Sequence, residues 1–298
     1  MPELDRYIPG VPCWIDTSQP DPEAAVAFYR DLFGWDVESV MPPEAPGEYF
    51  MARIRGGDVA GIGSIPEGSP PIATWNTYIW VDSADETAAK VKDAGGNVLM
   101  EPFDVMTSGR MAVVSDPEGA VFCVWEPNQH RGAQIVNEAG SVNFNNLNTR
   151  DAAGARSFYG AVFGWGTMQM GGGAEGWTLP AYGDHLERLN PGTRERMGAM
   201  GAPGGFIDVV ATLVPLQDDQ ADVPAHWSVT FATDDADATA EKASALGGKV
   251  LAPPFDAPWV RMTIIADPQG ATFIASQFAP ENRDAPAPES ASSASVNA

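Results

Sequence analysis

The chain contains few of the side chains that bind metal ions or form disulfide bonds. Its 298 residues include three histidines (His130, His185 and His226) and two cysteines (Cys13 and Cys123). No H-x-H, H-x-x-x-H or C-x-x-C sequence occurs, so the common local metal-binding spacings are missing. Two cysteines give no disulfide framework of the kind that stabilises small secreted domains. We therefore expect neither a motif-based metal centre nor disulfide stabilisation.

Basic residues and long apolar segments are also scarce. Only 17 Lys and Arg oppose 40 Asp and Glu, which gives a formal net charge of −23. A surface this negative repels phosphate backbones and anionic lipids, so we exclude nucleic acids and membranes as partners. No apolar run approaches the ~20 residues of a membrane-spanning helix, and the first ten residues contain no hydrophobic signal segment. We expect a cytoplasmic protein whose negative charge serves solubility.

What the chain does contain is internal repetition. The segment DPEAAVAFYRDLFGW (21–35) recurs as DAAGARSFYGAVFGW (151–165), 130 positions later. The segments starting at 84 and 115, ADETAAKVKDAGGNVLMEPFD and SDPEGAVFCV, recur 152 and 151 positions later. Three ordered matches predict a tandem duplication, consistent with the two domains that 298 residues suggest. The growing offset places an insertion in the second copy, around 182–205.

Within each copy, one order of elements occurs twice: a strand, a helix and three further strands. In the first copy, VPCWIDT reads as a strand, and the next helix is bounded by Asp21 as N-cap, Pro22 at its first position and Gly34 at its end. We predict a first domain at 9–127, a linker at 128–140, a second domain at 141–278 and a disordered Ala/Ser/Pro-rich tail at 279–298. In the insertion, we expect YGDHLER to be a loop and GTRERMGAM to be a short helix.

Two motifs carry a resemblance to a known family. The first is FY-x-x-x-FGW, at 28–35 and 158–165, and the second is the DP-x-GA hairpin that begins at Asp116 and Asp267. With these motifs, residues 9–278 resemble the glyoxalase/bleomycin resistance protein/dioxygenase superfamily, also called the vicinal oxygen chelate superfamily. The chain is most similar to its double-domain, glyoxalase-like proteins of actinobacterial type. The resemblance implies an α+β fold of two tandem domains, in which two strand-helix-strand-strand-strand modules form a half-open barrel.

The resemblance also implies where a divalent metal would bind on the concave face of each barrel. The superfamily places His, Glu or Gln ligands on the first strand, on the first strand of the second module and on the last strand. In this sequence the three positions fall on Trp14, Asn76 and Cys123 in the first copy and on Phe144, Ser228 and Ile274 in the second. Indole, phenyl and alkyl groups cannot ligate a metal. We therefore predict no metal and no cofactor, which argues against metal-dependent glyoxalase or dioxygenase activity.

Alternation along the strands predicts the side chains that line the two concave faces. An aromatic lining with a few polar groups suits a flat organic ligand, although the same rings could instead pack between domains and enclose nothing. The candidate ligand-binding residues are Trp14, Asn76, Tyr78, Trp80, Cys123 and Trp125 in the first copy and Phe144, Asn146, Ser228 and Thr230 in the second.

Two functions remain open at this point. In the first, the protein binds a small aromatic or polyketide-like molecule without metal. In the second, it is a metal-independent tailoring enzyme (a cyclase, an epimerase or a hydroxylase-like protein) with Asp16, His185 and Glu187 as candidate acids and bases. We expect His185 to lie over the second pocket, where neighbouring carboxylates could orient it. A relocated metal site at Asp184, His185 and Glu187 is a further alternative. Internal pairing of the two copies predicts a monomer or a weak homodimer.

Overall fold

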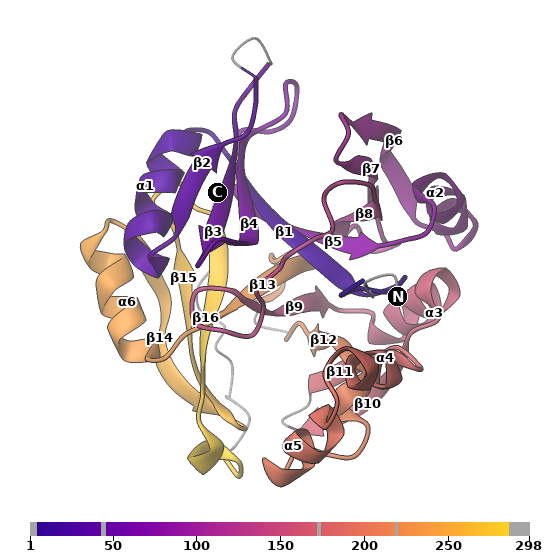
Figure 1. The fold of residues 1–298 in the computed structure, drawn as a ribbon, viewed down its shortest axis with the longest axis vertical. Coiled ribbons are helices and arrows are strands. Elements are labelled where there is room, and N and C mark those ends of the chain that lie inside the picture. The colour runs from indigo at the N-terminus through magenta and orange to yellow at the C-terminus, as the bar shows by residue number, and fades with distance from the viewer. Residues whose placement is uncertain (1–4, 43–45, 172–173, 218–219, 286–298) are drawn as a thin grey trace.

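The computed structural model describes residues 5–42, 46–171, 174–217 and 220–285. In these residues the strands form two sheets of eight strands each, and every sheet comes from one copy of the duplication (Figure 1). The first copy contains β1 (Pro12–Gln19), α1 (Pro22–Phe33), β2 (Asp36–Ser39), β3 (Tyr49–Ile54), β4 (Gly57–Ser64), β5 (Thr74–Trp80), α2 (Ala84–Asp93), β6 (Asn97–Val105), β7 (Gly109–Ser115) and β8 (Val121–Pro127).

The second copy repeats this order and adds helices between its third and fourth strands. It contains β9 (Val142–Thr149), α3 (Ala152–Phe163), β10 (Gly166–Gly171), β11 (Ala174–Thr178), α4 (Tyr182–Leu189), α5 (Thr193–Ala199), η1 (Phe206–Asp208), β12 (Val209–Pro215), β13 (His226–Ala232), α6 (Ala236–Ala245), β14 (Lys249–Ala257), β15 (Val260–Ala266), β16 (Thr272–Phe278) and η3 (Pro280–Asn282). The predicted α+β architecture of two tandem domains is confirmed. None of the helices in the described ranges is long and apolar enough to cross a membrane.

The two sheets have the same strand order, β2-β3-β4-β1-β5-β8-β7-β6 and β10-β11-β12-β9-β13-β16-β15-β14. In the first sheet, β1 pairs in parallel with β4, β5 pairs in parallel with β8, and β1 and β5 join the two modules in antiparallel pairing. The parallel pairs require a crossover, which the helix and the intervening strands of each module provide. The four strands that begin and end the modules therefore lie together at the centre of each sheet.

The predicted helix boundaries have the expected local causes. The Asp21 carboxylate accepts a hydrogen bond from the backbone N–H of Ala24 at 3.0 Å, and Asp151 caps α3 in the same way at 2.8 Å. Gly34 ends α1 with a φ of 73°, a left-handed conformation that glycine adopts without strain.

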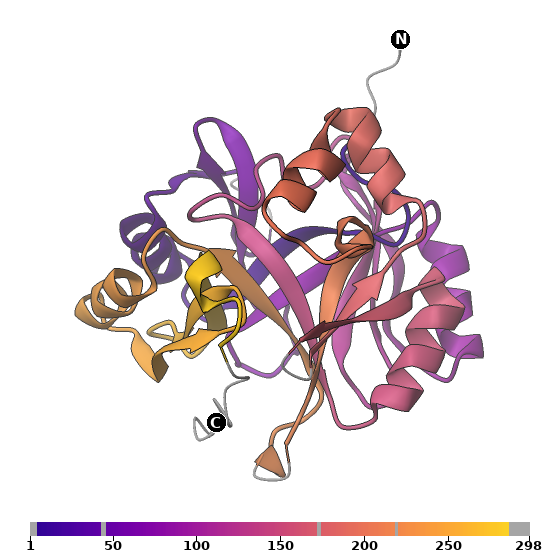
Figure 2. The ribbon, with the colours of Figure 1, turned by 90° about the horizontal axis from the view of Figure 1, so that it is seen from below.

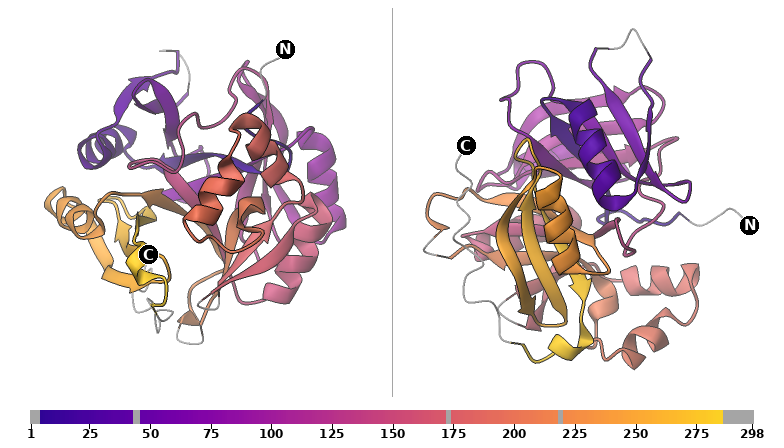
Figure 3. Two further views of the ribbon diagram at one scale, coloured as in Figure 1. Left: turned by 60° about the horizontal axis from the view of Figure 1, so that its bottom comes forward. Right: turned by 90° about the vertical axis from the view of Figure 1, so that its left-hand side faces the viewer.

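The helices of different copies lie side by side on opposite flanks of the molecule. Helix α1 packs beside α6, and α2 packs beside α3 (Figures 1 and 2). Figure 3 shows the first of these pairs in its right-hand view. The buried apolar residues of the described chain accordingly form two clusters, each drawn from both copies. One cluster is drawn mainly from the first and last modules, and the other mainly from the two middle modules.

The two sequence motifs of the repeat meet at this interface. The Tyr29 hydroxyl donates to Asp267 Oδ2 at 2.9 Å and accepts a hydrogen bond from Trp75 Nε1 at 3.0 Å. The other interface repeats the arrangement: Tyr159 donates to Asp116 Oδ2 at 3.1 Å and accepts from Trp227 Nε1 at 2.9 Å. The FY-x-x-x-FGW helix of one copy is thus joined to the DP-x-GA hairpin of the other.

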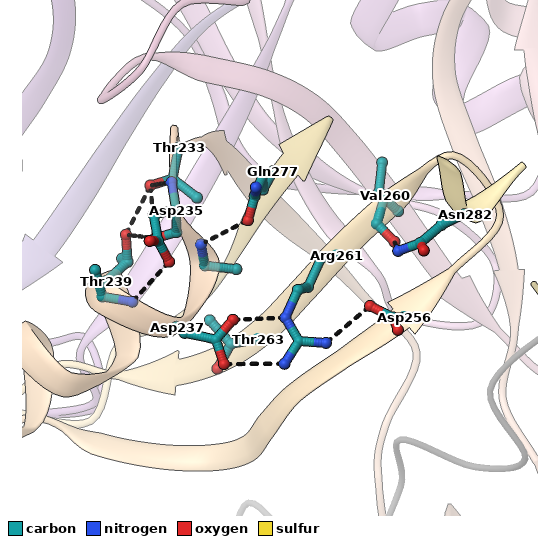
Figure 4. A network of polar contacts seen from close by, with 12 residues as sticks. Thr233, Asp235, Asp237, Thr239, Asp256, Val260, Arg261, Thr263, Gln277 and Asn282 are labelled. Carbon is teal, nitrogen blue, oxygen red and sulfur yellow. Dashed lines mark hydrogen bonds and ion pairs between the residues drawn. The ribbon is translucent and has the colours of Figure 1, made fainter. Parts of the chain in front are cut away.

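A smaller polar network holds α6 against the β14–β15 hairpin. Arg261 donates to both oxygens of Asp237 at 2.6 and 2.9 Å and to Asp256 at 2.8 Å, as Figure 4 shows. Arg110 makes the matching contacts with Asp85 and Asp104 in the first copy. The side of each sheet that carries its helices is therefore built alike in both copies.

Two local predictions differ from the structure. The segment YGDHLER, which we expected to be a loop, forms α4. In its first turn, the backbone N–H of Gly183 donates to the Asp208 carboxylate at 2.8 Å. The tail was expected to be disordered from 279, but residues 280–282 form η3. The backbone N–H of Trp259 donates to the Asn282 carbonyl at 3.2 Å, which fixes this turn against the hairpin. Residues 286–298 of the predicted tail lie outside the described residues.

Candidate functional site

Each sheet has one face turned away from its own helices, and we call these the first and second inner faces. On the first inner face, Trp14, Tyr78 and Cys123 lie next to one another because β1, β5 and β8 pair in that register. All three side chains are buried, as is that of Trp125, whose ring lies 6.3 Å from that of Tyr78. Strand pairing thus brings the predicted residues of the first copy together, and Trp80, the register partner of Trp125, also lines a cavity at the end of β5.

Asp16 lies at the centre of the first inner face and is 6% exposed. Its carboxylate accepts hydrogen bonds from Asn76 Nδ2 at 2.9 Å, the Tyr78 hydroxyl at 2.8 Å and the Tyr49 hydroxyl at 3.1 Å. Burial raises the pKa of Asp16 above its ordinary value, and the three hydrogen bonds oppose the rise. The result is a fully hydrogen-bonded carboxyl group whose pKa lies above that of an exposed aspartate.

Sequence reasoning missed Tyr49, which comes from β3. Its hydroxyl reaches Asp16 across β4 because Gly61 has no side chain: a Cβ at Gly61 would lie 2.1 Å from that hydroxyl oxygen. Tyr49 also accepts a hydrogen bond from Trp14 Nε1 at 3.1 Å. The signal that could have identified this residue is the glycine at the β4 position opposite Asp16.

The linker supplies a second residue that the sequence did not assign to the site. The ring of His130 meets that of Trp14 edge-on at 4.4 Å, and the His130 carbonyl accepts from Trp125 Nε1 at 3.0 Å. Its buried Nε2 has no hydrogen-bond partner in the described part of the chain. Burial lowers the pKa of His130, which favours the neutral imidazole. The first inner face is thus filled largely by rings from this protein itself.

The second inner face is polar and uncharged. Asn146 takes the position of Asp16: its Nδ2 donates to Thr230 Oγ1 at 2.9 Å, and its Oδ1 accepts from Thr212 Oγ1 at 2.6 Å. Asn148 Nδ2 donates to Ser228 Oγ at 3.0 Å. Phe144 lies beside these groups, half-buried, with its ring 6.5 Å from that of Phe206 in the insertion. The predicted residues of the second copy therefore lie together.

The floor of the second inner face also has smaller side chains than that of the first. Thr230, paired with Phe144 and Ile274, takes the place of Tyr78. Two residues farther along β16, Ser276 takes the place that Trp125 has on β8. The second sheet therefore carries two small hydroxyl side chains, both buried, where the first carries a phenol and an indole.

The candidate acids and bases of the insertion do not lie over the second inner face. His185 is buried against the N-terminal segment, with Nε2 at 3.2 Å from the Arg6 carbonyl oxygen. The Glu187 carboxylate accepts from the backbone N–H groups of Gly192 at 2.6 Å and Arg194 at 3.0 Å, and these bonds lower its pKa. Glu187 therefore caps α5, which begins at Thr193. Asp16, in the other domain, is separate from both.

The donor groups present do not fit the divalent metal that the fold implies. At the expected positions, Trp14, Phe144 and Ile274 offer no donor atom, and the Cys123 thiol is buried with its pKa raised by desolvation. Within the described residues, no three His, Cys, Asp or Glu side chains converge, which includes the alternative site at Asp184, His185 and Glu187. Neither inner face therefore has the side chains to hold a catalytic metal in the way that the superfamily does.

Comparison with known proteins agrees with this architecture. A family profile described as "Glyoxalase/Bleomycin resistance protein/Dioxygenase superfamily" matches residues 14–124 and 140–274. The "Putative glyoxylase CFP32" of Mycobacterium tuberculosis (strain CDC 1551 / Oshkosh) is 40% identical over 286 residues, which cover 94% of this chain and all of that protein. The "Anthracycline biosynthesis protein DauV" of Streptomyces sp. (strain C5) is 35% identical, over 91% of this chain and 94% of its own.

Solved structures share the fold at much lower identity. The Mn(II)-bound glyoxalase from Novosphingobium aromaticivorans superposes with a TM-score of 0.57 at 14% identity, over 91% of this chain and 83% of its own. The 2,3-dioxygenase LapB from Pseudomonas sp. KL28 gives a TM-score of 0.56 at 12% identity, over 91% of this chain and 93% of its own. Both copies of the repeat are matched by the family profile, and each contains the two predicted strand-helix-strand-strand-strand modules. The chain therefore belongs to the glyoxalase/bleomycin resistance protein/dioxygenase superfamily.

Proposed function

We propose that the protein binds a small, flat, polyketide-like aromatic molecule on the second inner face, without the help of a metal. The observation that carries this proposal is the uncharged network of Asn146, Asn148 and Ser228 beside the half-buried ring of Phe144. Amide and hydroxyl groups can both donate to carbonyl oxygens and accept from phenolic hydroxyls. A polycyclic phenol or quinone carries such groups around an apolar body, which would stack on the ring of Phe144.

The relatives support this class of ligand. Two proteins named for anthracycline biosynthesis, from Streptomyces sp. (strain C5) and Streptomyces peucetius, are 35% and 34% identical to this chain. Their names place them in anthracycline biosynthesis, and an anthracycline is a flat, polycyclic aromatic compound. The proposed role for this chain is binding, because the second inner face has no acid or base among its lining residues Phe144, Asn146, Ser228, Thr230 and Ile274.

Exchange of floor residues between the two inner faces tests the proposal. Emodin, a hydroxylated anthraquinone, serves as the probe, and quenching of the intrinsic fluorescence reports its binding. The double substitution Thr230→Tyr/Ser276→Trp fills the second face as the first is filled, and should weaken binding at least about tenfold. The matched pair Asn148→Ala and Ser18→Ala, at equivalent positions of the two copies, should lower affinity only in the first case. Equal emodin affinities for the wild type, the double variant and both single variants would contradict the proposal.

One observation favours catalysis as a second candidate function. Asp16 is a buried carboxyl with a raised pKa, held between two tyrosine hydroxyls, which is the setting of a general acid or base. Such a group suits a reaction that only moves protons, such as enolisation before a cyclisation. The test is deuterium exchange at the acidic carbon of benzoylacetone, followed by NMR. Exchange above the buffer rate that is lost in Asp16→Asn supports catalysis, and an unchanged rate excludes it.

We also propose that the protein is a monomer. Each helix pair, α1 with α6 and α2 with α3, already buries within one chain the surface that a single-domain protein would cover by dimerising. Light scattering after size exclusion should give the mass of one chain, 31.6 kDa. An obligate dimer or tetramer would contradict this.

A further inference from the structure

A cavity of about 540 Å³ lies at the junction of the first domain and the insertion, at the Trp80 end of β5. Its lining comes from the N-terminal segment, the ends of β5 and β8, the linker and α4. Its volume falls within the roughly 300–1,000 Å³ that is usual for small-molecule sites. Among the predicted site residues, Trp80 and His185 line it.

The floor of this cavity is aromatic and well fixed. Tyr7 and Trp80 are both buried, with ring centroids 5.9 Å apart. The Tyr7 hydroxyl donates to the Ala133 carbonyl at 2.7 Å, which anchors the N-terminal segment to the linker. The Arg131 guanidinium lies 5.2 Å above the Trp80 ring and is ion-paired with Asp5. The Trp80 ring is therefore already covered by a cation, and the Tyr7–Trp80 pair gives this part of the cavity a rigid base.

Charged residues of opposite sign come from different parts of the structure. The insertion contributes His185 and Arg188, which are three positions apart on α4 and therefore face the same way. Arg188 is exposed and makes no ion pair within the described residues, although acidic residues outnumber basic ones by 40 to 17 in this chain. The first domain contributes Asp82 and Glu126. Glu126 Oε2 also accepts from the backbone N–H of Ala84 at 3.0 Å, whereas Asp82 forms no ion pair in the same residues.

We propose that this cavity is a second ligand site, for a small zwitterion. Its body lies beside the Arg131–Trp80 pair, the positively charged nitrogen points to Asp82 and Glu126, and the acidic group points to Arg188. A simple anion is disfavoured by those two carboxylates and by the net charge of −23, and a simple cation leaves Arg188 without a partner because Arg131 is already paired with Asp5. A zwitterion satisfies both sets at once. The site is independent of the aromatic ligand proposed for the second inner face.

Three probes with the same indole ring separate these possibilities. L-Tryptophan carries both charges, tryptamine lacks the carboxylate and indole-3-propionate lacks the ammonium group. Isothermal titration calorimetry on the full chain should show L-tryptophan binding at millimolar concentration, at least about threefold more tightly than either analogue, since a partly exposed ion pair contributes little. No heat of binding for L-tryptophan, or equal affinity for all three probes, would overturn the proposal.

Two substitutions assign the charges to their residues. Arg188→Gln should reduce the affinity for L-tryptophan to that for tryptamine and leave tryptamine binding unchanged. Asp82→Asn should reduce it to that for indole-3-propionate and leave that probe unchanged. Arg30→Gln, an exposed arginine on α1, is the matched control and should change nothing. If neither Arg188→Gln nor Asp82→Asn alters L-tryptophan binding, the site is wrongly placed. Emodin should not displace L-tryptophan, so failure of either proposal leaves the other intact.

Discussion

The first inner face holds a buried carboxylate among aromatic rings, whereas the second holds an uncharged network of amide and hydroxyl groups. The opposite sides of the same two sheets hardly differ. The Tyr29–Asp267 contact in one helix pair is matched by Tyr159–Asp116 in the other, with similar distances. The side of each sheet that packs against the other copy is thus constrained by a partner that must fit it. The inner faces have no such partner and could diverge.

The largest expected difference between the two inner faces is in stability. Asp16→Ala leaves two tyrosine hydroxyls and one amide without their acceptor, and should lower the free energy of unfolding by about 3 kcal/mol or more. Asn146→Ala at the equivalent position should cost about 1–2 kcal/mol, because the Thr212 and Thr230 hydroxyls can rotate to other acceptors. Urea unfolding measures both values. Equal losses would mean that the charged network contributes no more than the neutral one.

The two helix interfaces should differ less in the stability that they lose, with the larger loss at the α2–α3 interface. Tyr159→Phe removes the side-chain donor to Asp116 Oδ2 and should cost about 2 kcal/mol. Tyr29→Phe should cost about 1 kcal/mol, because Gln19 Nε2 still donates to Asp267 Oδ2 at 2.7 Å. Thermal and urea unfolding of both variants test this order. A greater loss for Tyr29→Phe would show that Gln19 does not compensate.

The smallest expected effect is a pH dependence that only the first inner face should have. The pKa of Asp16 is raised from its ordinary value near 3.8, so the folded state binds this proton more tightly than the unfolded state. The stability of the wild type relative to Asp16→Asn should therefore fall as pH rises from about 3.8 through the raised pKa, and should then level off. Urea unfolding between pH 3 and 8 gives the difference curve, roughly over the range where carboxyl groups titrate. A relative stability that rises with pH would reverse the assigned shift.

Asn146→Ala serves as the control for that curve. It removes no titratable group, so its stability relative to the wild type should not change across the same pH range. A pH-dependent difference for this variant would indicate that the second inner face senses a charge from elsewhere in the molecule.

Much of this architecture could be predicted from the sequence because the repeat fixes the order of elements twice. Asp21 and Gly34 set the ends of a helix by local hydrogen bonding and backbone conformation, and such local causes are readable without a structure. Strand alternation likewise placed Trp14, Tyr78 and Cys123 together on one face. These predictions depended only on the spacing of residues within one element or between paired central strands.

The missed features depend on contacts between distant segments. Tyr49 reaches Asp16 only because Gly61 lies opposite, and His130 packs on Trp14 only because the linker folds back over the sheet. His185 was placed over the second inner face because the insertion belongs to the second copy. The structure instead turns α4 toward the N-terminal segment, where His185 contacts Arg6. No spacing rule in the sequence carries that information.

The composition of the two hydrophobic clusters has a consequence for how this protein can be divided. Each cluster combines residues of both copies, so cutting the chain at the linker would expose part of both clusters rather than release two finished domains. The two halves should behave as complementing fragments, each disordered alone and folding only on reassociation. Recombination could exchange the whole pair between relatives, whereas a single copy from another protein would arrive without its complementary half.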